Sequence, residues 1–331
     1  MKRCLTWLII LVTLSVSLPA VTENEFMYRG NVTTRYETSY TNIYEEMDLE
    51  SPILATYYAG RALQITKVYP YWVEVLFRDG VGYVVRQRVD IGSAVDPKHT
   101  PPYGTEVNRY YTIAENDLVI HADKDPDSPV LSVLTYGARA SFIGMEDGWA
   151  KLIYQRQYGY IDSRTMTNMH RVNMNAEEPE DINEPIGIFT SYYSDNPTRI
   201  NNLARCCIRL NRVMKPKQEL NFNTSVGPFK KQNGYAEAPV LIDGETKMGY
   251  GGGSCQVSST LYNVALQLPG ITVLERHAHG ESGAPYLPHG VDASSGSLNF
   301  RIRNDYPFPI RIEGTLHDFA LCIAVYKEAA E

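Results

Sequence analysis

A glycine-rich loop followed by a cysteine is the part of this sequence best suited to chemistry. The loop is Gly249-Tyr250-Gly251-Gly252-Gly253, and the run from Ser254 to Asn263 that follows it has apolar residues at helical spacing. This pattern predicts a helix that begins near Cys255. Because the first N–H groups of a helix have no partner within it, a thiolate there would be stabilised and its pKa lowered. The loop and helix therefore suit a nucleophile or a bound anion.

Two histidines follow this helix at a distance that could bring them back to the cysteine. A turn and then a strand of about the same length as the helix are predicted over residues 269–279. An antiparallel return would place His277 close to Cys255. Because side chains alternate along a strand, Glu275, His277 and His279 would share one face. Either histidine could then act as a base toward the thiol.

These residues support two kinds of site. In a thiol enzyme, Cys255 would be the nucleophile and His277 or His279 the general base, and Asp292 or Glu275 would orient the imidazole. In a binding module, the glycine loop and the helix N-terminus would cradle a carboxylate or phosphate, and the thiol would only pack. The residues expected to line such a ligand site are Gly251, Gly252, Gly253, Gln256, Ser258 and Ser259.

A zinc site is a third interpretation of the same residues. Cys255, His277 and His279 are all suitable zinc ligands, and two histidines two positions apart on a strand face the same way. The sequence has no second cysteine at a tight ligand spacing from them. It therefore predicts neither a metal nor a cofactor.

The elements that must position these residues are predicted to form an α+β domain over residues 186–328. An amphipathic helix is expected after Asn196-Pro197, where a capping residue precedes proline at the first helical position. Alternating or continuous apolar runs between residues 298 and 325 predict strands separated by turns. The helices would pack against this sheet, whose strand order the sequence does not determine.

The first half of the chain contains an internal repeat. An offset of 77 residues aligns Trp72 with Trp149, and neighbouring apolar positions also match without a gap. Each copy has short alternating runs and an Asp-Gly turn signal, which predict small antiparallel β-barrels over residues 26–92 and 105–167. An acidic stretch broken by two prolines follows and predicts a solvated linker over residues 168–185.

The start of the chain predicts export. Lys2 and Arg3 precede an apolar run that ends at Leu18-Pro19-Ala20, which is typical of a secretory signal peptide over residues 1–20. The protein is then expected to be secreted, extracellular or associated with the cell envelope. A bilayer span needs roughly 20 apolar residues, so no membrane span is expected after signal cleavage. A formal net charge of −7 at pH 7 would repel a phosphate backbone, so nucleic acid is not an expected partner.

The two repeats resemble the bacterial SH3-like domains of exported cell-wall proteins. The resemblance rests on a Ser-Pro-aliphatic start, a single tryptophan and a closing Gly-Tyr-aliphatic strand, and it covers about residues 35–92 and 110–167. In that family the domains are non-catalytic and many bind peptidoglycan. The resemblance thus implies a targeting role for the repeats.

The second half resembles the VanW-like family. Its signature is carried by Gly251 to Asn263, by Glu275-Arg276-His277-Ala278-His279 and by Tyr286 to Ala293, and the resemblance covers about residues 186–315. The family is named from vancomycin-resistance gene clusters and is associated with the bacterial cell envelope, but its biochemical activity is not established. The resemblance therefore implies a cellular context without a reaction.

The expected protein is multidomain, with two small all-β SH3-like barrels followed by an α+β VanW-like domain. It is expected to bind or remodel peptidoglycan or its precursors, with the repeats for targeting and the VanW-like domain as the functional module. The alternative is a cysteine-dependent peptidoglycan peptidase or transpeptidase that uses Cys255 with His277. A cysteine at a helix start, a histidine on a following strand and SH3-like domains upstream are also, by analogy, the plan of NlpC-type cysteine peptidases.

Overall fold

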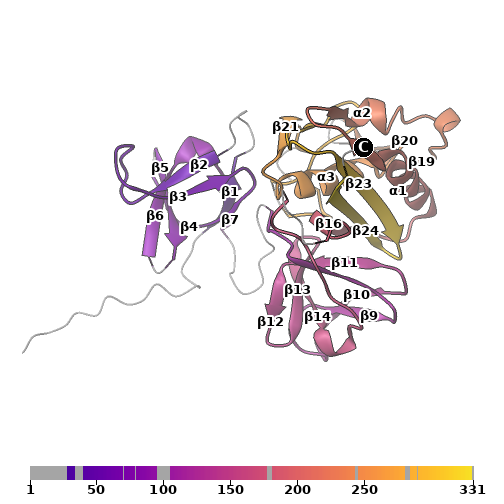
Figure 1. The fold of residues 1–331 in the computed structure, drawn as a ribbon, viewed down its shortest axis with the longest axis horizontal. Coiled ribbons are helices and arrows are strands. Elements are labelled where there is room, and N and C mark those ends of the chain that lie inside the picture. Colours follow the sequence, from indigo (N-terminus) through magenta and orange to yellow (C-terminus); the bar gives the residue numbers. More distant parts are fainter. Residues whose placement is uncertain are drawn as a thin grey trace, which may run out of the picture.

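The computed structural model describes most of the chain after the predicted signal peptide. The segment 1–20 lies outside the described residues, as do residues 26 and 27 of the first predicted barrel and residues 177–180 of the predicted linker. Figure 1 shows three consecutive parts: a first β unit (residues 28–94), a second β unit (105–171) and a C-terminal domain (185–329). The described residues are 28–33, 40–69, 71–78, 80–94, 105–176, 181–242, 245–279, 284–288 and 290–329.

The first β unit is a single antiparallel sheet in the described residues. Its strand order is β3-β2-β6-β5-β4-β1-β7. Alternation along β5 turns Val73 and Val75 inward, where they pack with Ile43 and Ile65 in a core of their own. The strands are β1 (Tyr28–Val32), β2 (Tyr40–Tyr44), β3 (Ile53–Tyr58), β4 (Ala62–Val68), β5 (Trp72–Phe77), β6 (Gly80–Val85) and β7 (Val89–Ala94).

The second β unit repeats this arrangement in two sheets, β10-β9-β14-β13-β12 and β11-β8-β15. Its described strands are β8 (Tyr110–Ile113), β9 (Leu118–His121), β10 (Val130–Leu134), β11 (Arg139–Phe142), β12 (Gly144–Glu146), β13 (Trp149–Tyr154), β14 (Gln157–Asp162) and β15 (His170–Arg171).

The internal repeat is visible in the boundaries of these strands. β13 and β14 begin and end 77 residues after β5 and β6, and the short 3₁₀ turns that follow, Arg86–Arg88 and Ser163–Thr165, keep the same offset. Several antiparallel sheets in the N-terminal half are thus confirmed. Closure into barrels and membership of the SH3-like class stay predictions.

The C-terminal domain is α+β, as predicted. One sheet has the order β16-β24-β23-β17, a second has the order β18-β22-β21, and β19 and β20 form a hairpin. Its described elements are β16 (Pro185–Tyr192), α1 (Pro197–Leu210), β17 (Arg212–Met214), β18 (Glu219–Asn221), α2 (Phe222–Ser225), β19 (Glu237–Ile242), β20 (Glu245–Tyr250), α3 (Ser254–Ala265), β21 (Ile271–Glu275), β22 (Arg301–Asn304), β23 (Ile310–His317) and β24 (Ala320–Lys327).

Helix α1 begins where its sequence predicts. The Asn196 side chain accepts a hydrogen bond from the N–H of Arg199, and proline occupies the first turn. Cys206 and Cys207 are neighbours in this helix and point about 100° apart, yet both thiols are buried. Cys207 packs against Gly314 of β23, while Cys206 contacts the Tyr235 hydroxyl, so the helix is covered on two sides.

The main sheet of the C-terminal domain is covered on both faces. Along β24, Leu321, Ile323 and Val325 belong to the core shared with the helices, whereas the alternate residues Cys322 and Ala324 pack with the second β unit. Ser141 of β11 and Thr190 of β16 also exchange hydrogen bonds of 3.0 and 2.9 Å between backbone N–H groups and hydroxyls. The second β unit and the C-terminal domain are therefore packed as one body.

The described part of the predicted linker takes part in this packing. Asn168 is hydrogen-bonded to Thr112 and Ile113 of β8, β15 pairs with the same strand, and Val172 is buried among residues of the shared core. This part of the chain is therefore packed and hydrogen-bonded, whereas the sequence predicted a solvated linker. These contacts arise because the short β15 completes the β11-β8-β15 sheet before the chain enters β16.

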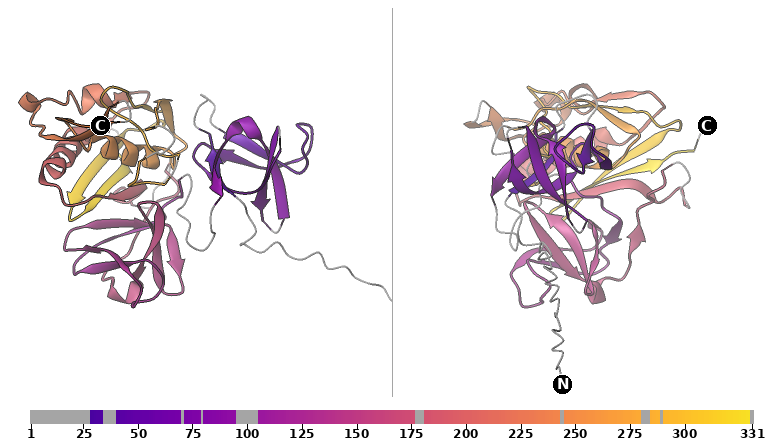
Figure 2. Two further views of the ribbon diagram at one scale, coloured as in Figure 1. Left: turned by 180° about the vertical axis from the view of Figure 1, so that it is seen from behind. Right: turned by 90° about the vertical axis from the view of Figure 1, so that its left-hand side faces the viewer.

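The first β unit lies beside the C-terminal domain (Figure 2) and touches it at Gly60, in the turn after β3, and at Asn31 of β1. Gly60 approaches Leu266 so closely that an added Cβ would lie 2.7 Å from its Cδ1, and Gly290 approaches the side chain of Asn31 in the same way. Among the described residues, the core of the first β unit contains none from the C-terminal domain. None of the helices in the described part of the chain is long and apolar enough to cross a bilayer.

Candidate functional site

Two left-handed glycines set the start of α3. Gly251 and Gly253 have φ of 83° and 110°, a region that side chains disfavour. Between them, a Cβ on Gly252 would lie 2.6 Å from the carbonyl oxygen of Pro239 in β19. All three glycines are buried. The loop therefore brings the helix N-terminus tightly against β19, and it places Cys255 as the second residue of α3.

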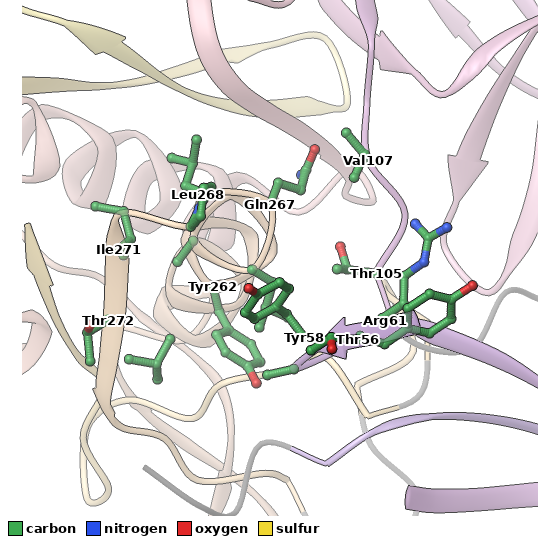
Figure 3. Close-up of a pocket in the computed structure, with 16 residues that line it drawn as sticks. Thr56, Tyr58, Arg61, Thr105, Val107, Tyr262, Gln267, Leu268, Ile271 and Thr272 are labelled. Atoms are coloured by element: carbon green, nitrogen blue, oxygen red, sulfur yellow. The ribbon is translucent and has the colours of Figure 1, made fainter. Parts of the chain in front are cut away.

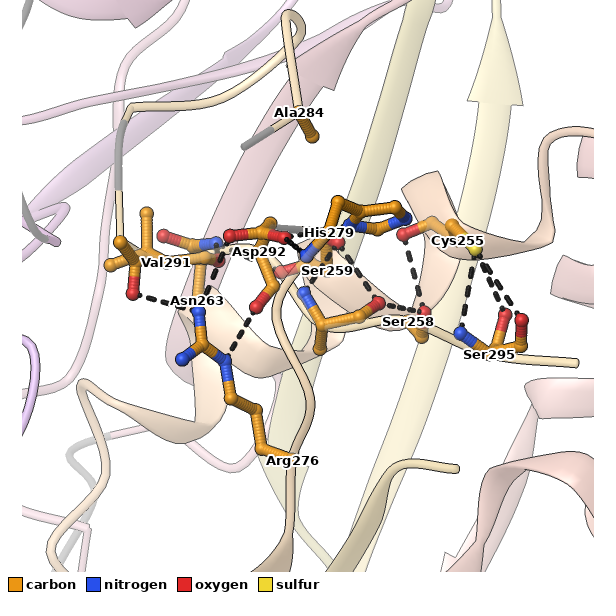
Figure 4. A network of polar contacts seen from close by, with 12 residues as sticks. Cys255, Ser258, Ser259, Asn263, Arg276, His279, Ala284, Val291, Asp292 and Ser295 are labelled. Carbon is orange, nitrogen blue, oxygen red and sulfur yellow. Dashed lines mark hydrogen bonds and ion pairs between the residues drawn. The ribbon is translucent and has the colours of Figure 1, made fainter. Parts of the chain in front are cut away.

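Cys255 is partly buried and is bordered by Ser295. The backbone N–H of Ser295 lies 3.4 Å from Sγ, and the Ser295 hydroxyl lies 3.6 Å from it (Figure 4). Both groups can donate to a thiolate. The N–H of Cys255 itself has no acceptor in the part of the chain that the structure describes. Among the described residues, one backbone donor in the first turn of α3 is thus unsatisfied, on the residue that carries the sulfur.

The side chain of His279 lies beside Cys255 and links it to Asp292 (Figure 4). Its Nδ1 is 2.6 Å from Oδ2 of Asp292, and the same oxygen accepts the backbone N–H of His279, also at 2.6 Å. Because an ionised carboxylate only accepts, Nδ1 carries its hydrogen and Nε2 is left for the thiol. Cys255, His279 and Asp292 thus form a consecutive chain of polar contacts.

The electrostatics of this chain favour a charged cysteine and a charged histidine. Burial alone would raise the pKa of Cys255, but the hydrogen bond and positive charge of His279, together with the donors of Ser295, lower it below its ordinary value. Burial opposes the charge on His279, yet Asp292 and Cys255 raise its pKa to about 9. These contacts therefore favour the thiolate form of Cys255 and the imidazolium form of His279.

Arg276 fixes the carboxylate of Asp292 from the other side. Its Nη2 lies 3.3 Å from Oδ1, and its Nε donates to the backbone carbonyl of Asp292 at 2.7 Å. Asp292 has only 2% of its side chain exposed. Burial by itself would raise the pKa of Asp292, but His279 and Arg276 together lower it. The carboxylate is therefore ionised and held in one orientation.

The serines of α3 anchor the segment that carries Asp292 and Ser295. Ser258 Oγ donates to the carbonyl of Ala293 at 2.6 Å, and Ser259 Oγ accepts the Ala293 N–H at 2.8 Å. Gln256 is likewise engaged, since its Nε2 donates to the carbonyl of Tyr192 and its Oε1 accepts from Arg199. The polar groups of these three predicted ligand-binding residues are thus bonded within the protein. Their binding of a ligand stays a prediction.

The structure brings His279 to the thiol and leaves His277 apart. The strand predicted to run through residue 279 ends at Glu275, because Arg276 and His279 turn away from the sheet to contact Asp292. His277 pairs instead with Glu275 at 3.2 Å, and 43% of its side chain is exposed. The face that these residues would share in a continuous strand is therefore not formed.

Tyr286 and Arg199 belong to the site although the sequence did not single them out. Burial raises the pKa of Tyr286, the negative charge of Cys255 raises it further, and the phenol is hydrogen-bonded to Ser259. The guanidinium of Arg199 lies 5.6 Å from the centre of the Tyr286 ring. Arg199 has no spacing relation to Cys255 that sequence alone could reveal. Tyr286 and Arg276 were more accessible to prediction, because they stand inside the Tyr286–Ala293 and Glu275–His279 signatures.

Metal ligation finds no support in the part of the chain that is described. There, no group of three or more His, Cys, Asp or Glu side chains is arranged to hold a metal ion. The four described cysteines are all free thiols. Cys206, Cys207 and Cys322 are buried, and burial raises the pKa of each, to about 12 for Cys206. Cys255 differs from them in both exposure and pKa.

Comparison with known proteins identifies the C-terminal region. Residues 198–326 match the family model described as VanW like protein. A stretch of 148 residues, 44% of the chain, is 36% identical to the uncharacterized protein YoaR of Bacillus subtilis, of which it covers 48%. Another of 147 residues, 42% of the chain, is 30% identical to the vancomycin B-type resistance protein VanW of Enterococcus faecalis, of which it covers 52%. The C-terminal region is therefore a VanW-like domain homologous to both.

These matches cover only part of this chain and part of each relative. The chain spans about half the length of the curated relatives that it matches. The family model begins after both β units, so it does not test their SH3-like assignment. It does include Cys255, His279 and Asp292.

Solved structures give only distant similarity. NlpC2 from Trichomonas vaginalis aligns with a TM-score of 0.24 and 9% identity, covering 92% of this chain and 99% of that one. An NlpC/P60 family protein from Bacillus cereus aligns with a TM-score of 0.18 and 9% identity, covering 89% and 93%. Scores this low do not establish a shared fold.

Proposed function

We propose that this is an exported cell-envelope protein whose VanW-like domain hydrolyses or transfers an acyl group of peptidoglycan or its precursors through Cys255. The observation that carries the proposal is the contact chain from Cys255 through His279 to Asp292. His279 takes the role of the base that the sequence offered to either histidine. Asp292 and Arg276 hold the imidazole in place.

The geometry supports a two-step acyl transfer. The Cys255 thiolate attacks the carbonyl carbon of an amide, and the electron pair moves to the carbonyl oxygen. When this intermediate collapses, the C–N bond breaks, and the imidazolium of His279 protonates the leaving amine. A thioester on Cys255 and a neutral imidazole result. The free N–H of Cys255 is suitably placed to donate to the oxyanion.

The second step regenerates the enzyme. The neutral His279 removes a proton from water as the water oxygen attacks the thioester, and the thioester C–S bond breaks. The products are a carboxylic acid, the Cys255 thiolate and the imidazolium with which the cycle began. With an amine in place of water, the same step forms a new amide and makes the protein a transpeptidase.

Three observations support the cell wall as the source of substrate. The family resemblance links the VanW-like domain with the bacterial cell envelope, and one relative is named a vancomycin B-type resistance protein. The β units resemble wall-binding SH3-like modules. The first 20 residues have the pattern of a secretory signal. The amide of a peptidoglycan stem peptide is therefore the proposed substrate.

A purely ligand-binding role for the glycine loop has less support. Such a site needs free polar groups, yet Gly251 to Gly253 are buried, and Gln256, Ser258 and Ser259 bond to other parts of the protein. In addition, a lowered thiol pKa has no use in a module that only packs Cys255.

The test is the rate of alkylation of Cys255 against pH, followed by mass spectrometry of its peptide in the mature protein. We expect a half-rise below the ordinary thiol pKa of about 8.5, shifted upward in His279→Ala and unchanged in His277→Ala. Cys206, Cys207 and Cys322 are internal controls, because burial raises their pKa values and should keep them slow. A half-rise at or above 8.5, or one that ignores His279, would contradict the proposal.

Substrate is then sought with the same variants. Peptidoglycan digests and soluble stem peptides are incubated with the mature protein and analysed by mass spectrometry for a cleaved or exchanged amide. The products should disappear in Cys255→Ala. A reactive Cys255 together with intact wall peptides would refute peptidoglycan as the substrate while leaving the thiol chemistry in place.

A further inference from the structure

A cavity of about 500 Å³ lies between the first β unit and the C-terminal domain. Figure 3 shows that residues from both parts surround it. One wall comes from β3 and the turn that follows, and the other from the end of α3 and the start of β21. The volume falls within the range of small-ligand sites, which often form where domains meet. The cavity is separate from the thiol site, because Tyr262 lies two helical turns, about 10 Å, along α3 from Cys255.

The lining combines aromatic faces with neutral hydrogen-bonding groups. Tyr57 and Tyr58 contribute from β3 and Tyr262 from α3; Tyr58 is 66% exposed, whereas Tyr262 is fully buried, so Tyr58 offers the open ring face. Gln267 and Thr105 add polar atoms. A tyrosine offers an apolar face with a polar tip, which suits a ring that has C–H groups on its faces and hydroxyls at its edge.

Thr105 supplies a hydroxyl that the protein itself does not use. The residue is 5% exposed and lines the cavity, and its Oγ1 has no hydrogen-bond partner among the described residues. Its backbone is fixed, because its N–H donates to the carbonyl of Gly60 at 2.7 Å. Leaving a buried hydroxyl without a partner costs about 1 to 3 kcal/mol. A ligand hydroxyl or carboxylate in the cavity would remove that cost.

The charge among the described lining residues is positive. Of these residues Arg61 alone is charged, and it has no carboxylate partner in the described part of the chain. Its guanidinium lies 5.4 Å from the centre of the Tyr57 ring. An anionic group on the ligand would therefore meet an uncompensated cation beside an aromatic face.

The second β unit shows that these residues are not required by the fold. At the offset of 77, Tyr57, Tyr58 and Arg61 correspond to Leu134, Thr135 and Ala138. The equivalent turn also meets the C-terminal domain, since a Cβ on Gly137 would contact His317 and Thr135 bonds Asp318. Both turns thus pack against the C-terminal domain. Tyr57, Tyr58 and Arg61 have no counterparts of the same residue type at these positions of the second β unit.

From these observations we infer that the cavity binds an acidic saccharide, a pyranose ring that carries a carboxylate. The ring stacks on the exposed face of Tyr58, its hydroxyls bond Thr105 and Gln267, and its carboxylate pairs with Arg61. The inference goes beyond the proposed chemistry, because binding at this cavity does not require Cys255.

The test uses the mature Cys255→Ala protein, which separates binding from turnover. Isothermal titration calorimetry compares the disaccharide of N-acetylglucosamine and N-acetylmuramic acid, whose lactyl group is a carboxylate, with neutral di-N-acetylchitobiose. The acidic disaccharide should bind at least tenfold more tightly. Arg61→Gln should remove that preference, and Tyr58→Ala should weaken both sugars at least tenfold. Tyr136→Ala, which removes a tyrosine 72% exposed on the second β unit, is the control and should change neither.

Three outcomes would overturn the inference. The first is equal binding of the two sugars with no effect of Arg61→Gln. The second is weakening of similar size in Tyr136→Ala, which would place the sugar elsewhere. The third is binding of a sugar-free stem peptide with the same losses in Arg61→Gln and Tyr58→Ala, which would make the cavity a peptide site. None of them bears on the alkylation of Cys255, so each can be told apart from failure of the thiol chemistry.

Discussion

Two histidine–carboxylate pairs lie close together in the sequence of the C-terminal domain, and they differ in their surroundings. His279 and Asp292 have 12% and 2% of their side chains exposed, and they approach to 2.6 Å. His277 and Glu275 have 43% and 32% exposed, and they approach to 3.2 Å. The first pair also touches the Cys255 thiol and Arg276, whereas the second lies beside the end of a strand.

The comparison teaches that a histidine paired with a carboxylate can be either a candidate catalytic pair or an ordinary surface pair. The difference is the low polarity around the buried pair, which strengthens each charge interaction and keeps the imidazole in one orientation. Exposed pairs of the second kind contribute roughly 0 to 1 kcal/mol. Substitutions that treat the two pairs alike should therefore give very different results.

Loss of each imidazole should give the largest contrast. His279→Ala should lower the turnover of a wall peptide by about 10² to 10⁴, because it removes the general base and the charge that stabilises the thiolate. His277→Ala should stay within about twofold of the native protein. Turnover is followed by mass spectrometry of the released fragments. A similar loss in both variants would mean that the exposed histidine also contacts substrate.

Replacement of the carboxylate should lower the free energy of unfolding much more in the buried pair than in the exposed pair. Asp292→Asn removes a buried negative charge that pairs with both Arg276 and His279, so the free energy of unfolding should fall by about 3 kcal/mol or more. Glu275→Gln should change it by less than about 1 kcal/mol. Urea unfolding followed by circular dichroism measures both. Equal values would show that burial does not distinguish the two carboxylates.

The pH dependence of the reaction should report only the buried pair. The rate should rise as Cys255 ionises, below the ordinary thiol pKa, and should fall as the imidazolium of His279 loses its proton near pH 9. The bell shape follows because the reactive form needs both charges. His277→Ala should keep this profile, measured as kcat/KM. A rate that continues to rise above pH 9 would contradict the assignment of the acid to His279.

The smallest expected effect comes from the helix that holds the buried pair. Ser259→Ala removes the acceptor of the Ala293 N–H and should lower the unfolding free energy by about 1 to 2 kcal/mol. Asn116→Ala, on the exposed surface of the second β unit, is the control and should cost less than about 0.5 kcal/mol. If Ser259→Ala instead leaves stability unchanged but weakens binding of a wall fragment, the serine is a ligand residue rather than an anchor.

Sequence could predict those features that rest on local patterns. The helix start next to Cys255, the cap of α1 and the 77-residue repeat are all local, and the structure has each of them. Local sequence could not decide whether His277 or His279 lies beside Cys255. The answer depends on where β21 ends, and that is set by Arg276 and Asp292, which are sixteen positions apart. Alternation assumes an unbroken strand and cannot detect this end.

The function of the glycine loop was also beyond a local pattern. Four glycines in five residues predict backbone freedom, and both close packing and ligand approach use that freedom. The structure shows the packing, through β19 against Gly252. The covering of both faces of the main sheet was easier to predict from sequence. β24 is apolar at every position except Lys327, and β16 does not alternate between apolar and polar residues.

That double covering also bears on how this chain could be recombined with others. Ile188, Tyr192 and Cys322 face the second β unit, and separation from it would open them to water. A gene fusion that takes only the residues after the acidic stretch would therefore yield a protein prone to aggregate. A junction between residues 94 and 105 would keep the second β unit with the C-terminal domain. The first β unit is the interchangeable module, and exchanging it would replace one wall of the cavity and leave the thiol site whole.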